Sequence, residues 1–305
     1  MTSISASKDF EQYRPSLMKR LFPDGSASVL RYLIILVLIM WAAFSLFPIY
    51  WAFITSFKPP DDVSSLPPKV YLTEVSFHSY DSLFKGVGVA NANVGLWFLN
   101  SCIVTAGTMV GTLLLASLAG YSFAKKEYPG RDYMFWMLIA TMLIPGWATL
   151  VPQYLFTGQL GLHDTFWVLI LPGLASPFAV FLVRQFMITL PSELFQAARV
   201  DGASEWQLWS RIALPLSRPV LGTLAVFTLV SSWNQFLWPM LVLNKNRKFT
   251  LLVGASTIMY QFQDRGPTYG ISMAVAVLMS AVPVITFLIL QRQMVRGLTI
   301  GALKG

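Results

Sequence analysis

Six long stretches of the chain contain no Asp, Glu, Lys or Arg, and polar connectors separate them. These stretches are Tyr32–Phe57, Gly86–Ala124, Tyr133–His163, Thr165–Val183, Pro219–Asn244 and Gly266–Gln291. A membrane-crossing helix needs about 20 apolar residues, because about 1.5 Å per residue must cover about 30 Å of hydrocarbon. An open sheet would leave backbone groups unpaired in lipid. The pattern therefore predicts an all-α integral membrane protein with six transmembrane helices, the second from about Leu96 and the last from about Gly270.

The distribution of basic residues predicts the orientation of these spans. An even number of spans places both termini on one side. If that side is the cytoplasm, the inside segments carry fifteen Lys and Arg residues and the outside loops carry seven. Cytoplasmic loops of membrane proteins are enriched in Lys and Arg. We therefore expect both termini of this multi-pass protein in the cytoplasm, although the basic loop 245–265 favours the opposite orientation.

The composition agrees with a lipid environment and excludes several classes of function. Only 12% of the residues are charged, and the mean hydropathy is +0.59, whereas a soluble domain carries about 25% charged residues. The net charge of +8 comes from residues that flank apolar runs. We therefore expect the lipid bilayer, and no nucleic acid, as a partner. Two histidines and one cysteine leave no cluster suited to a metal ion.

The spans lack the groups that would let this chain drive transport by itself. No acidic or basic side chain lies deep in any span, although ion-coupled carriers commonly place such groups at mid-membrane. The chain also has no glycine-rich loop ending in Lys-Ser or Lys-Thr to hold phosphates. Catalytic groups do not cluster in a polar domain, so we expect neither an enzyme nor a bound cofactor. Energy must come from a partner, or transport is passive.

Prolines and small residues give further expectations about packing. Pro145, Pro172, Pro177 and other prolines within the spans are expected to kink or interrupt helices. The second span carries Gly107, Gly111, Ala116 and Gly120, at a spacing that lets another helix approach closely. Packing inside the bundle is the preferred interpretation of this face, and a homodimer contact is the weaker one.

The connector between the fourth and fifth spans, residues 190–219, is too patterned for a simple loop. Ser192 is a candidate N-cap, and Leu194, Ala197 and Ala198 share one helical face. Asp201-Gly202 would end this helix, because glycine tolerates a left-handed turn.

A second helix is predicted directly after that turn. Ser204-Glu-Trp-Gln207 fits a capping box, Trp209, Ile212 and Ala213 form an apolar stripe, and Leu214-Pro215 would end the helix. The pattern alone allows two interpretations of this helix–turn–helix segment. It is either an amphipathic element lying on the membrane interface or a docking surface for a cytoplasmic partner.

The sequence Glu193-Leu-Phe-Gln-Ala-Ala-Arg-Val-Asp-Gly-Ala, followed by Ile212-Ala-Leu-Pro215, closely resembles the "EAA" loop of ABC-importer permeases. Within that family the chain is similar to the smaller permease of maltose-type carbohydrate importers. The resemblance covers roughly residues 30–305. Its other supporting stretches include Tyr128-Pro-Gly-Arg131, Phe181-Leu-Val-Arg-Gln-Phe186 and Trp233-Asn-Gln-Phe-Leu-Trp-Pro239.

The resemblance implies a type I ABC importer permease fold and a transport complex. Its members would be a second homologous permease, two ATPase subunits that hold ATP and Mg²⁺, and an extracytoplasmic substrate-binding protein. The residues implied in coupling to an ATPase are Glu193, Gln196, Ala197, Ala198, Asp201, Gly202, Ala203, Ile212, Leu214 and Pro215. Gln196 stands where the family has a glutamate, which places the ion pair of that glutamate with the ATPase in doubt.

The expected domain organisation has three parts. Residues 1–29 would form a cytoplasmic N-terminal segment, 30–292 the six-helix permease domain, and 293–305 a cytoplasmic tail. In the resembling permeases this tail enters the interface between the ATPases, and its glycines suit an irregular segment. In the resembling family the loop that corresponds to the outside loop 244–269 meets the binding protein, and plain solvation of its charges is the alternative interpretation.

Polar and aromatic residues of the fifth span give a candidate solute path. Trp233, Asn234, Gln235 and Trp238 suit a carbohydrate or polyol, because sugars bind through hydrogen bonds and aromatic faces. Helix–helix hydrogen bonds and interfacial tryptophan packing explain the same residues equally well. The alternative to an ATP-driven importer is a stand-alone secondary carrier or facilitator of a small polar solute.

Overall fold

The structure is a computed structural model that describes residues 27–63, 65, 67–85, 93–262 and 269–302. The chain divides into two compact units, Met1–Ala52 and Phe53–Gly305. Every regular element in the described residues is helical. In chain order these are α2 (Ala27–Ser56), α3 (Pro60–Val63), α4 (His78–Lys85), α5 (Val94–Lys125), α6 (Arg131–Ala140), η1 (Thr141–Leu143), α7 (Gly146–Gln159), α8 (Trp167–Leu174), α9 (Pro177–Ile188), α10 (Ser192–Val200), α11 (Glu205–Gln207), η2 (Leu208–Ala213), α12 (Leu214–Leu216), α13 (Arg218–Trp233), α14 (Leu237–Val242), η3 (Asn246–Lys248), α15 (Leu251–Phe262) and α16 (Tyr269–Ala302).

Three stretches of helix in the described residues are long and apolar enough to cross a membrane, namely Arg31–Ser56, Val94–Lys125 and Tyr269–Ile289. Three further pairs of helices qualify only when each pair is taken together, because the pairs are bent by 98°, 41° and 76°. By length and composition the described chain therefore offers up to six spans. Two of these bends fall at prolines named in the sequence. Pro145 lies at the N-cap of α7, and Pro177 is the first residue of α9.

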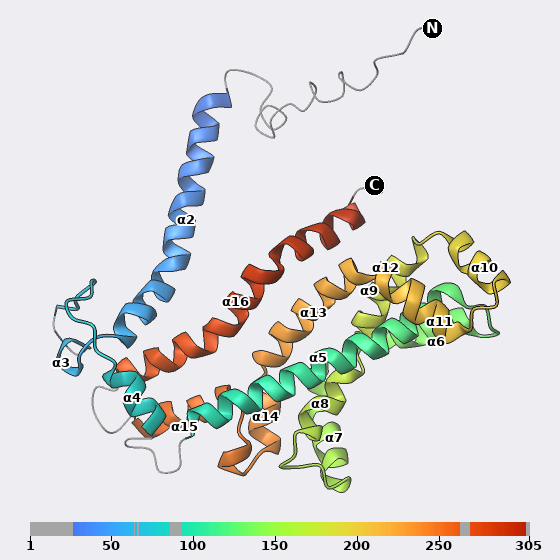
Figure 1. The fold of residues 1–305 in the computed structure, drawn as a ribbon. Helices are drawn as coiled ribbons and strands as arrows, with labels where there is room; N and C mark the ends of the chain where they lie inside the picture. Colours follow the sequence, from blue (N-terminus) through green and yellow to red (C-terminus); the bar gives the residue numbers. More distant parts are fainter. Residues whose placement is uncertain (1–26, 64, 66, 86–92, 263–268, 303–305) are drawn as a thin grey trace. The chain divides into compact units, whose positions relative to one another are not determined.

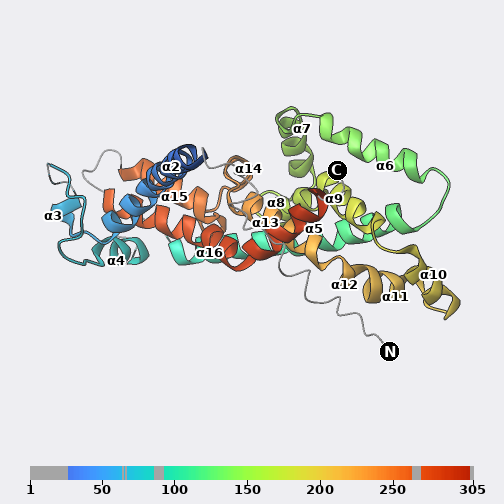
Figure 2. The same cartoon turned by 90° about the horizontal axis from the view of Figure 1, so that it is seen from above.

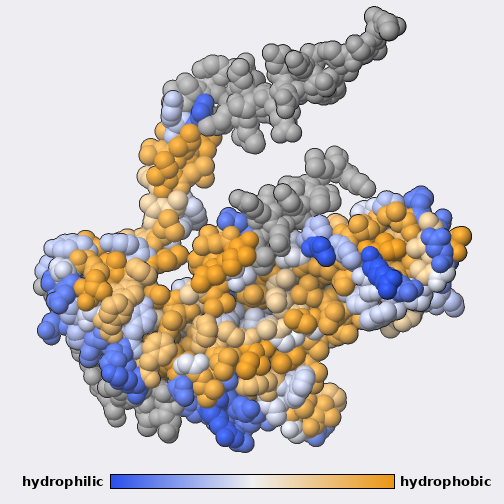
Figure 3. All heavy atoms as spheres, viewed as in Figure 1, coloured by the Kyte–Doolittle hydropathy of each residue, from blue (hydrophilic) through white to orange (hydrophobic). Residues whose placement is uncertain are grey.

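The second unit is organised around α5. Both views place α10 and α11 at the Lys125 end of α5, and α4 at its Val94 end (Figures 1 and 2). Between these ends α5 packs against α8, α9 and α13, and α13 packs in turn against α16. On the face drawn in Figure 3, hydrophobic residues dominate the middle of this unit, and hydrophilic residues gather toward its two ends.

The small-residue face of α5 makes the close helix contacts that the sequence predicts within the bundle. A Cβ atom added at Gly120 would lie 2.7 Å from Cγ1 of Val183 on α9. At Gly111 an added Cβ would overlap Leu174 of α8, and Ala116 is only 2% exposed. Real Cβ atoms do not approach other atoms this closely, so α8 and α9 pack at this distance because these α5 positions are small.

The segment predicted as an outside loop, 244–269, contains a helix that the sequence analysis missed. α15 is packed against α5 and α16, and its Leu251 and Ile258 are each 2% exposed. A side chain at Gly254 would overlap the indole of Trp97. The charge-free runs gave no sign of α15, because its polar flanks at 245–248 and near 263–265 made it resemble a connector.

Polar side chains of α5 hold the main chain that leads into α15. Trp97 Nε1 donates to Asn246 O at 2.9 Å, and Asn100 Nδ2 donates to the carbonyls of Arg247 and Phe249, each at 2.9 Å. The hydroxyl of Ser101 accepts the amide of Leu251 at 2.8 Å. These three α5 side chains are buried, and they fix the loop while satisfying its backbone groups.

Asp164 joins the α7–α8 turn to the same loop. It is the one residue other than glycine with a positive φ in the described chain, at 58°. Its Oδ1 accepts the amides of Asn244 and Lys245 at 2.6 and 2.9 Å, and its own amide donates to Val242 O at 3.0 Å. Burial raises the pKa of Asp164, but the two backbone hydrogen bonds outweigh it and leave the pKa below its usual value.

Replacing Asp164 with Ala is expected to loosen this junction by about 2 kcal/mol, because two hydrogen bonds to a charged acceptor are lost and Ala tolerates a positive φ poorly. Hydrogen exchange at the amides of Asn244 and Lys245 in the detergent-solubilised protein measures the effect. Asp164→Asn keeps an acceptor and tolerates this backbone conformation, so it should lose less protection.

The same junction should depend on pH. A carboxylate with a lowered folded-state pKa stabilises the fold above its unfolded pKa, and this contribution is lost as the pH falls through the folded pKa. Protection of the two amides in the unmodified protein should therefore decline below about pH 4. Equal protection in Asp164→Ala and the unmodified protein at pH 7 would contradict this role.

Candidate functional site

The segment 190–219 forms the two consecutive helical parts that the sequence predicts. α10 ends at Val200, and Gly202 turns the chain with a φ of +81°. Ser204 caps the next helix. Its hydroxyl accepts the amide of Gln207 at 3.3 Å, and Oε1 of Gln207 accepts the amide of Ser204 at 2.8 Å. The predicted capping box is thus confirmed. Ser192 is not the N-cap of α10, because Pro191 occupies that position.

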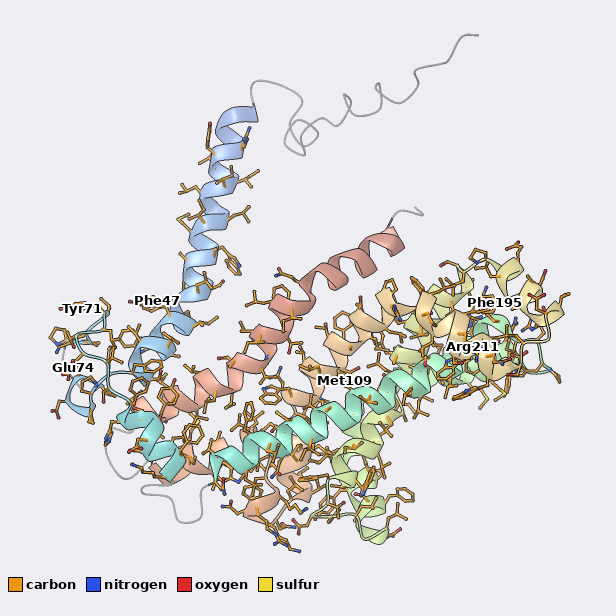
Figure 4. All side chains as sticks on the ribbon, viewed as in Figure 1. Phe47, Tyr71, Glu74, Met109, Phe195 and Arg211 are labelled. Carbon is orange, nitrogen blue, oxygen red and sulfur yellow. The ribbon has the colours of Figure 1, made fainter. Side chains whose placement is uncertain are left out.

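The buried face of α10 differs from the predicted one. Leu194 is 47% exposed and Ala197 is exposed, whereas Phe195 is 1% exposed and Ala198 packs beside it. Of the three residues predicted to share a face, only Ala198 packs against the core, and the buried face of α10 is centred on Phe195. The Phe195 ring lies 6.1 Å from the Tyr121 ring of α5. Figure 4 labels Phe195 at this end of α5.

The second helical part inserts its apolar stripe into the same core. Leu208 and Ala213 are fully buried, Trp209 is 5% exposed, and Ile212 packs at the edge. Residues 208–213 form a π-helical turn. Bonding from i to i+5 brings Leu208 and Ala213 onto one face. The helix does not end at Leu214-Pro215 as predicted but continues as α12 to Leu216, before the 76° bend into α13.

Glu205 is the polar centre of this docking, and the sequence analysis did not single it out. Its Oε2 accepts the hydroxyl of Tyr121 at 2.7 Å. Arg199 of α10 lies 3.4 Å from Oε1, and Nζ of Lys126 lies 3.7 Å from Oε2. One carboxylate therefore ties together α5, α10 and α11. Its place between Ser204 and Gln207 in the capping box was a signal only for the helix start.

Lys125 provides a second connection between α5 and α10. Its Nζ donates to Leu190 O at 2.7 Å and lies 3.4 Å from the hydroxyl of Ser192. The same ammonium group lies 5.2 Å from the centre of the Phe195 ring, and Arg199 donates to Lys125 O at 3.3 Å. Lys125 therefore contacts the start of α10 through Leu190 and Ser192. It contacts the middle and the end of α10 through the Phe195 ring and Arg199.

Arg184 holds α9 to α6 beside this site. Its guanidinium lies 3.9 Å from the centre of the Phe135 ring, and its Nε donates to Phe123 O at 3.3 Å. Asp132 lies 3.9 Å from its Nη2. The Phe181–Phe186 stretch quoted in the sequence analysis therefore carries a structural arginine. The Lys125 end of α5 is therefore held by α6 and α9 as well as by the 190–219 segment.

The opposite face of the 190–219 segment is exposed and mixed in character. Of the predicted coupling residues, Glu193, Gln196, Ala197, Asp201 and Gly202 are exposed, whereas Ala198, Ala203, Ile212, Leu214 and Pro215 are half-buried. Three apolar side chains accompany the exposed set. They are Leu194, Val200 at 88% and Trp206 at 64% exposed. We call this surface, formed by Glu193, Leu194, Gln196 and Ala197 with Val200–Gly202 and Trp206, the exposed edge.

A cavity of about 200 Å³ lies further along the bundle. Its lining comes from α5, α8, α9, α13 and the ends of these helices, namely Thr108, Thr112, Leu169, Gly173, Ser176, Phe178, Leu224, Phe227, Thr228, Ser231, Ser232 and Gln235. Of the predicted solute-path residues only Gln235 contributes to it. Met109, labelled in Figure 4, marks the neighbouring part of α5.

The two tryptophans of the predicted path have structural partners instead. Trp233 is 7% exposed and donates Nε1–H to Met279 O at 2.9 Å, which joins α13 to α16. Trp238 is 6% exposed and donates to Val168 O at 2.9 Å, which joins α14 to α8. Asn234 is exposed at the C-cap of α13. Sequence reasoning missed Thr108, Thr112 and Thr228, which lie on apolar spans without a motif.

Comparison with known proteins identifies the family. Residues 92–300 match the family described as binding-protein-dependent transport system inner membrane components. The chain belongs to this family. It is 33% identical over 284 residues to the arabinooligosaccharides transport system permease protein AraQ of Bacillus subtilis, covering 91% of this chain and 97% of that protein. It is also 33% identical over 266 residues to the sn-glycerol-3-phosphate transport system permease protein UgpE of Agrobacterium fabrum, with 86% and 94% covered.

The fold of this inner membrane component agrees with that assignment. A crystal structure of a bacterial ABC transporter involved in the import of alginate superimposes with a TM-score of 0.77 over 88% of this chain and 98% of that one, at 21% identity. The expected ABC importer permease fold is thereby confirmed. The chain is a transport subunit and not an enzyme, and ATP hydrolysis takes place in partner subunits. Importers of this kind work with a binding protein outside the membrane.

The Glu205 junction gives a direct test of how firmly the 190–219 segment is held. Glu205→Ala should lower the free energy of local opening by about 1–2 kcal/mol, because a charged hydrogen-bond acceptor is lost and its ion pairs are partly exposed. Hydrogen exchange at amides 205–213 is the measurement. The control is Glu193→Ala, which removes an exposed carboxylate from α10. Equal exchange in the two variants would contradict the anchoring role of Glu205.

Proposed function

We propose that this permease imports a carbohydrate or related polyol as one of two homologous permease subunits, with two ATPase subunits bound to the 190–219 segment. ATP and Mg²⁺ reside in the ATPases, and this chain holds no cofactor of its own. The single observation that carries the proposal is the construction of that segment. One face is locked onto α5, while the other presents the exposed edge.

The locked face explains how a movement of the ATPases would reach the spans. Phe195 and Leu208 are at most 1% exposed, and Glu205 bonds to α5 through Tyr121. Close-packed interiors transmit displacement instead of absorbing it. A force on the exposed edge would therefore move α5, together with α13, which α12 joins to this segment.

The exposed edge has the composition of a protein contact. Leu194, Val200 and Trp206 place apolar surface beside the carboxylates of Glu193 and Asp201. Contiguous exposed apolar groups with a polar rim mark interaction sites, and tryptophan is enriched among residues that dominate binding energy. This favours docking on an ATPase over lying flat on the membrane interface, since acidic groups would meet an anionic lipid surface there.

Gln196 is exposed on this edge and carries no charge. The docking would therefore rely on shape and apolar contact, with Glu193 and Asp201 as the remaining exposed carboxylates. An exposed ion pair contributes about 0–1 kcal/mol. The family's glutamate would accordingly add little to affinity, and its absence here is compatible with coupling.

The proposed orientation places the 190–219 segment and both termini in the cytoplasm. Lys125, Lys126, Arg184 and Arg199 gather around this segment in the structure. This concentration of basic residues agrees with the positive-inside tendency. The basic residues between positions 8 and 20, and Arg265, also contribute to the predicted charge difference between the two sides. They lie outside the described residues.

The tail and the opposite loop would meet the other partners. α16 continues as a helix to Ala302, so the irregular conformation expected from the glycines of the tail was wrong for 293–302. Residues 303–305 lie outside the described residues. A helical tail still extends beyond the predicted boundary at 292 and would approach the ATPases. On the other side, Lys245 and Arg247 are exposed for contact with the binding protein.

The carbohydrate class rests on the relatives and on the cavity. One relative is named for arabinooligosaccharides and another for sn-glycerol-3-phosphate, so polyhydroxylated solutes are common to both. The cavity between α5, α8, α9 and α13 offers hydroxyl and amide groups beside two phenylalanines. Such a lining suits hydroxylated solutes.

Gly202→Asp is expected to reduce ATP-coupled uptake by more than tenfold while the protein still inserts. The substitution forces an L-residue to a φ of +81° and adds a charge to the exposed edge. Uptake in cells and the amount of inserted protein are measured together. Gly202→Asn, which tolerates a left-handed backbone and adds no charge, should keep most of the uptake.

Gly130→Asp is the matched control for that experiment. Gly130 has a φ of +82°, and like Gly202 it has no neighbouring atom within 4 Å of an added Cβ. It lies outside the exposed edge. If Gly130→Asp abolished uptake as fully as Gly202→Asp, the effect would be one of backbone strain, and the coupling role would be contradicted.

The dependence on ATPase subunits separates this proposal from a stand-alone carrier. In proteoliposomes, uptake should require the complete complex and stop when the ATPases are inactivated by mutation. The purified chain alone should move no solute. Uptake by the chain alone, down a gradient and without ATP, would support the alternative of a secondary carrier or facilitator.

A further inference from the structure

The connector between α2 and α4, residues 57–77, carries apolar side chains on its outside. Tyr71 is 61% exposed, Val75 58% and Phe77 64%, and Leu72 is exposed as well. Figure 4 labels Tyr71 on this connector, together with Glu74. Single exposed apolar residues are ordinary, but several in one short stretch mark an interaction surface. We call Tyr71, Leu72, Val75 and Phe77 the outer apolar set.

The connector is folded on itself, so this exposure is not that of a loose chain. The carboxylate of Asp62 accepts hydrogen bonds from Nζ of Lys69 and from the hydroxyl of Thr73. Lys58, which is only 2% exposed, donates its Nζ to the carbonyl of Lys69. These bonds join the beginning of the connector to its second half. The outer apolar set therefore stays outside although the chain around it is ordered.

The end of the connector is tied to the end of α2. The amide of Ser76 donates to Phe57 O at 2.8 Å. The ring of Phe77 lies 5.6 Å from the ring of Phe57, which lies 5.2 Å from the ring of Phe53 in the last turn of α2. The residues around Ser76 are thus held at the level where α2 ends.

The length of α2 shows where that level lies in a bilayer. Its membrane-crossing stretch, Arg31–Ser56, has 26 residues. At about 1.5 Å per residue it is about 39 Å long. A bilayer is about 40–45 Å thick with its headgroups, of which about 30 Å is hydrocarbon. The Ser56 end therefore lies in the headgroup layer, and a segment that is one hydrogen bond away from Phe57 lies in the same layer.

We propose that the outer apolar set is seated in the lipid headgroup layer at the Ser56 end of α2, so that the phospholipid bilayer is the partner of this surface. In the proposed orientation this is the outer leaflet. Aromatic side chains are enriched in this layer, and apolar groups of interfacial elements lie about 5–10 Å into its boundary with the acyl chains. The inference requires that α2 crosses the membrane, and it depends neither on the solute nor on the ATPases.

Glu74 is compatible with this position. It is exposed between Leu72 and Val75. A charged side chain costs much at the middle of a bilayer but little near the interface, where it still reaches water. A soluble partner, such as the binding protein, would need a surface that stands clear of the headgroups. The tie between Ser76 and Phe57 favours lipid as the occupant.

Spin-label accessibility in the complete complex tests the seating. Cys102 is the only cysteine of the chain, so Cys102→Ser, assembled with cysteine-free partner subunits, gives a background without thiols. Tyr71→Cys then carries a nitroxide, and Val75→Cys is the second position if Tyr71→Cys fails to assemble. The complex is placed in nanodiscs of phosphatidylethanolamine and phosphatidylglycerol. Collisions of the nitroxide are measured with oxygen, which concentrates in lipid, and with a neutral nickel chelate, which stays in water.

Lys85→Cys is the matched control. Lys85 is exposed at the end of α4 and forms an ion pair with Asp81, so a label there should lie in water. We expect the ratio of oxygen to nickel collisions at Tyr71→Cys to be about threefold or more above that at Lys85→Cys, because the label lies in the headgroup–acyl boundary.

Three results would overturn the proposal. Equal nickel collisions at Tyr71→Cys and Lys85→Cys would place the outer apolar set in water. Few collisions with either reagent at Tyr71→Cys would place it against another subunit. Nickel collisions at Tyr71→Cys that disappear only when the binding protein is added would assign the surface to that protein.

A second pair of substitutions tests the carboxylate that holds the connector. Asp62→Ala removes the acceptor of Lys69 and Thr73, so the connector can open locally, and nickel collisions at the Tyr71→Cys label should rise about twofold or more. Asp61→Ala is the control, because Asp61 is the other carboxylate in the first turn of α3 and is exposed. Equal nickel collisions in Asp62→Ala and Asp61→Ala would contradict the role of Asp62 in holding the outer apolar set in the lipid.

Discussion

The attachment of the 190–219 segment to the Lys125 end of α5 is the constraint on which the functional interpretation depends. Phe195 and Leu208 are removed from solvent there, and Glu205 satisfies Tyr121 while holding Arg199. Apolar burial supplies the free energy, and the carboxylate fixes the register. If this contact were loose, a force on the exposed edge would bend the segment and would not move the bundle.

The helix bundle connects the attached 190–219 segment to the cavity. α5 carries small residues toward α8 and α9, so these helices approach closely and enclose a cavity with α13. The helix that follows the 190–219 segment, α13, forms one wall of this cavity. α13 therefore connects the 190–219 segment to the cavity wall, so under the proposed function a displacement of this segment would reach the cavity. A carrier without partners would have no use for the exposed edge.

Partners on the two sides of the membrane would meet differently built surfaces. Near the Val94 end of α5, Trp97, Asn100 and Asp164 hold an exposed basic loop by its backbone. The side chains of Lys245 and Arg247 thus stay free for electrostatic contact, which favours association rate and specificity. At the Lys125 end, the exposed edge presents Leu194, Val200 and Trp206, which favour tighter apolar docking.

The sequence by itself determined the helical class, the apolar runs, the breaks at Pro145 and Pro177 and the helix–turn–helix at 190–219. These features depend on local properties, namely residue hydropathy, ring constraints on φ and side-chain capping. Such local properties do not predict which residues of other helices a side chain will contact in the folded protein.

Tertiary structure alone decided that Phe195 is buried in place of Leu194, because the direction of α5 selects the face of α10. It also gave Trp233 and Trp238 main-chain partners in α16 and α8. In a membrane protein every span is apolar on all sides, so hydropathy does not distinguish lipid-facing from helix-facing positions. Only the packing of one helix against another makes that distinction.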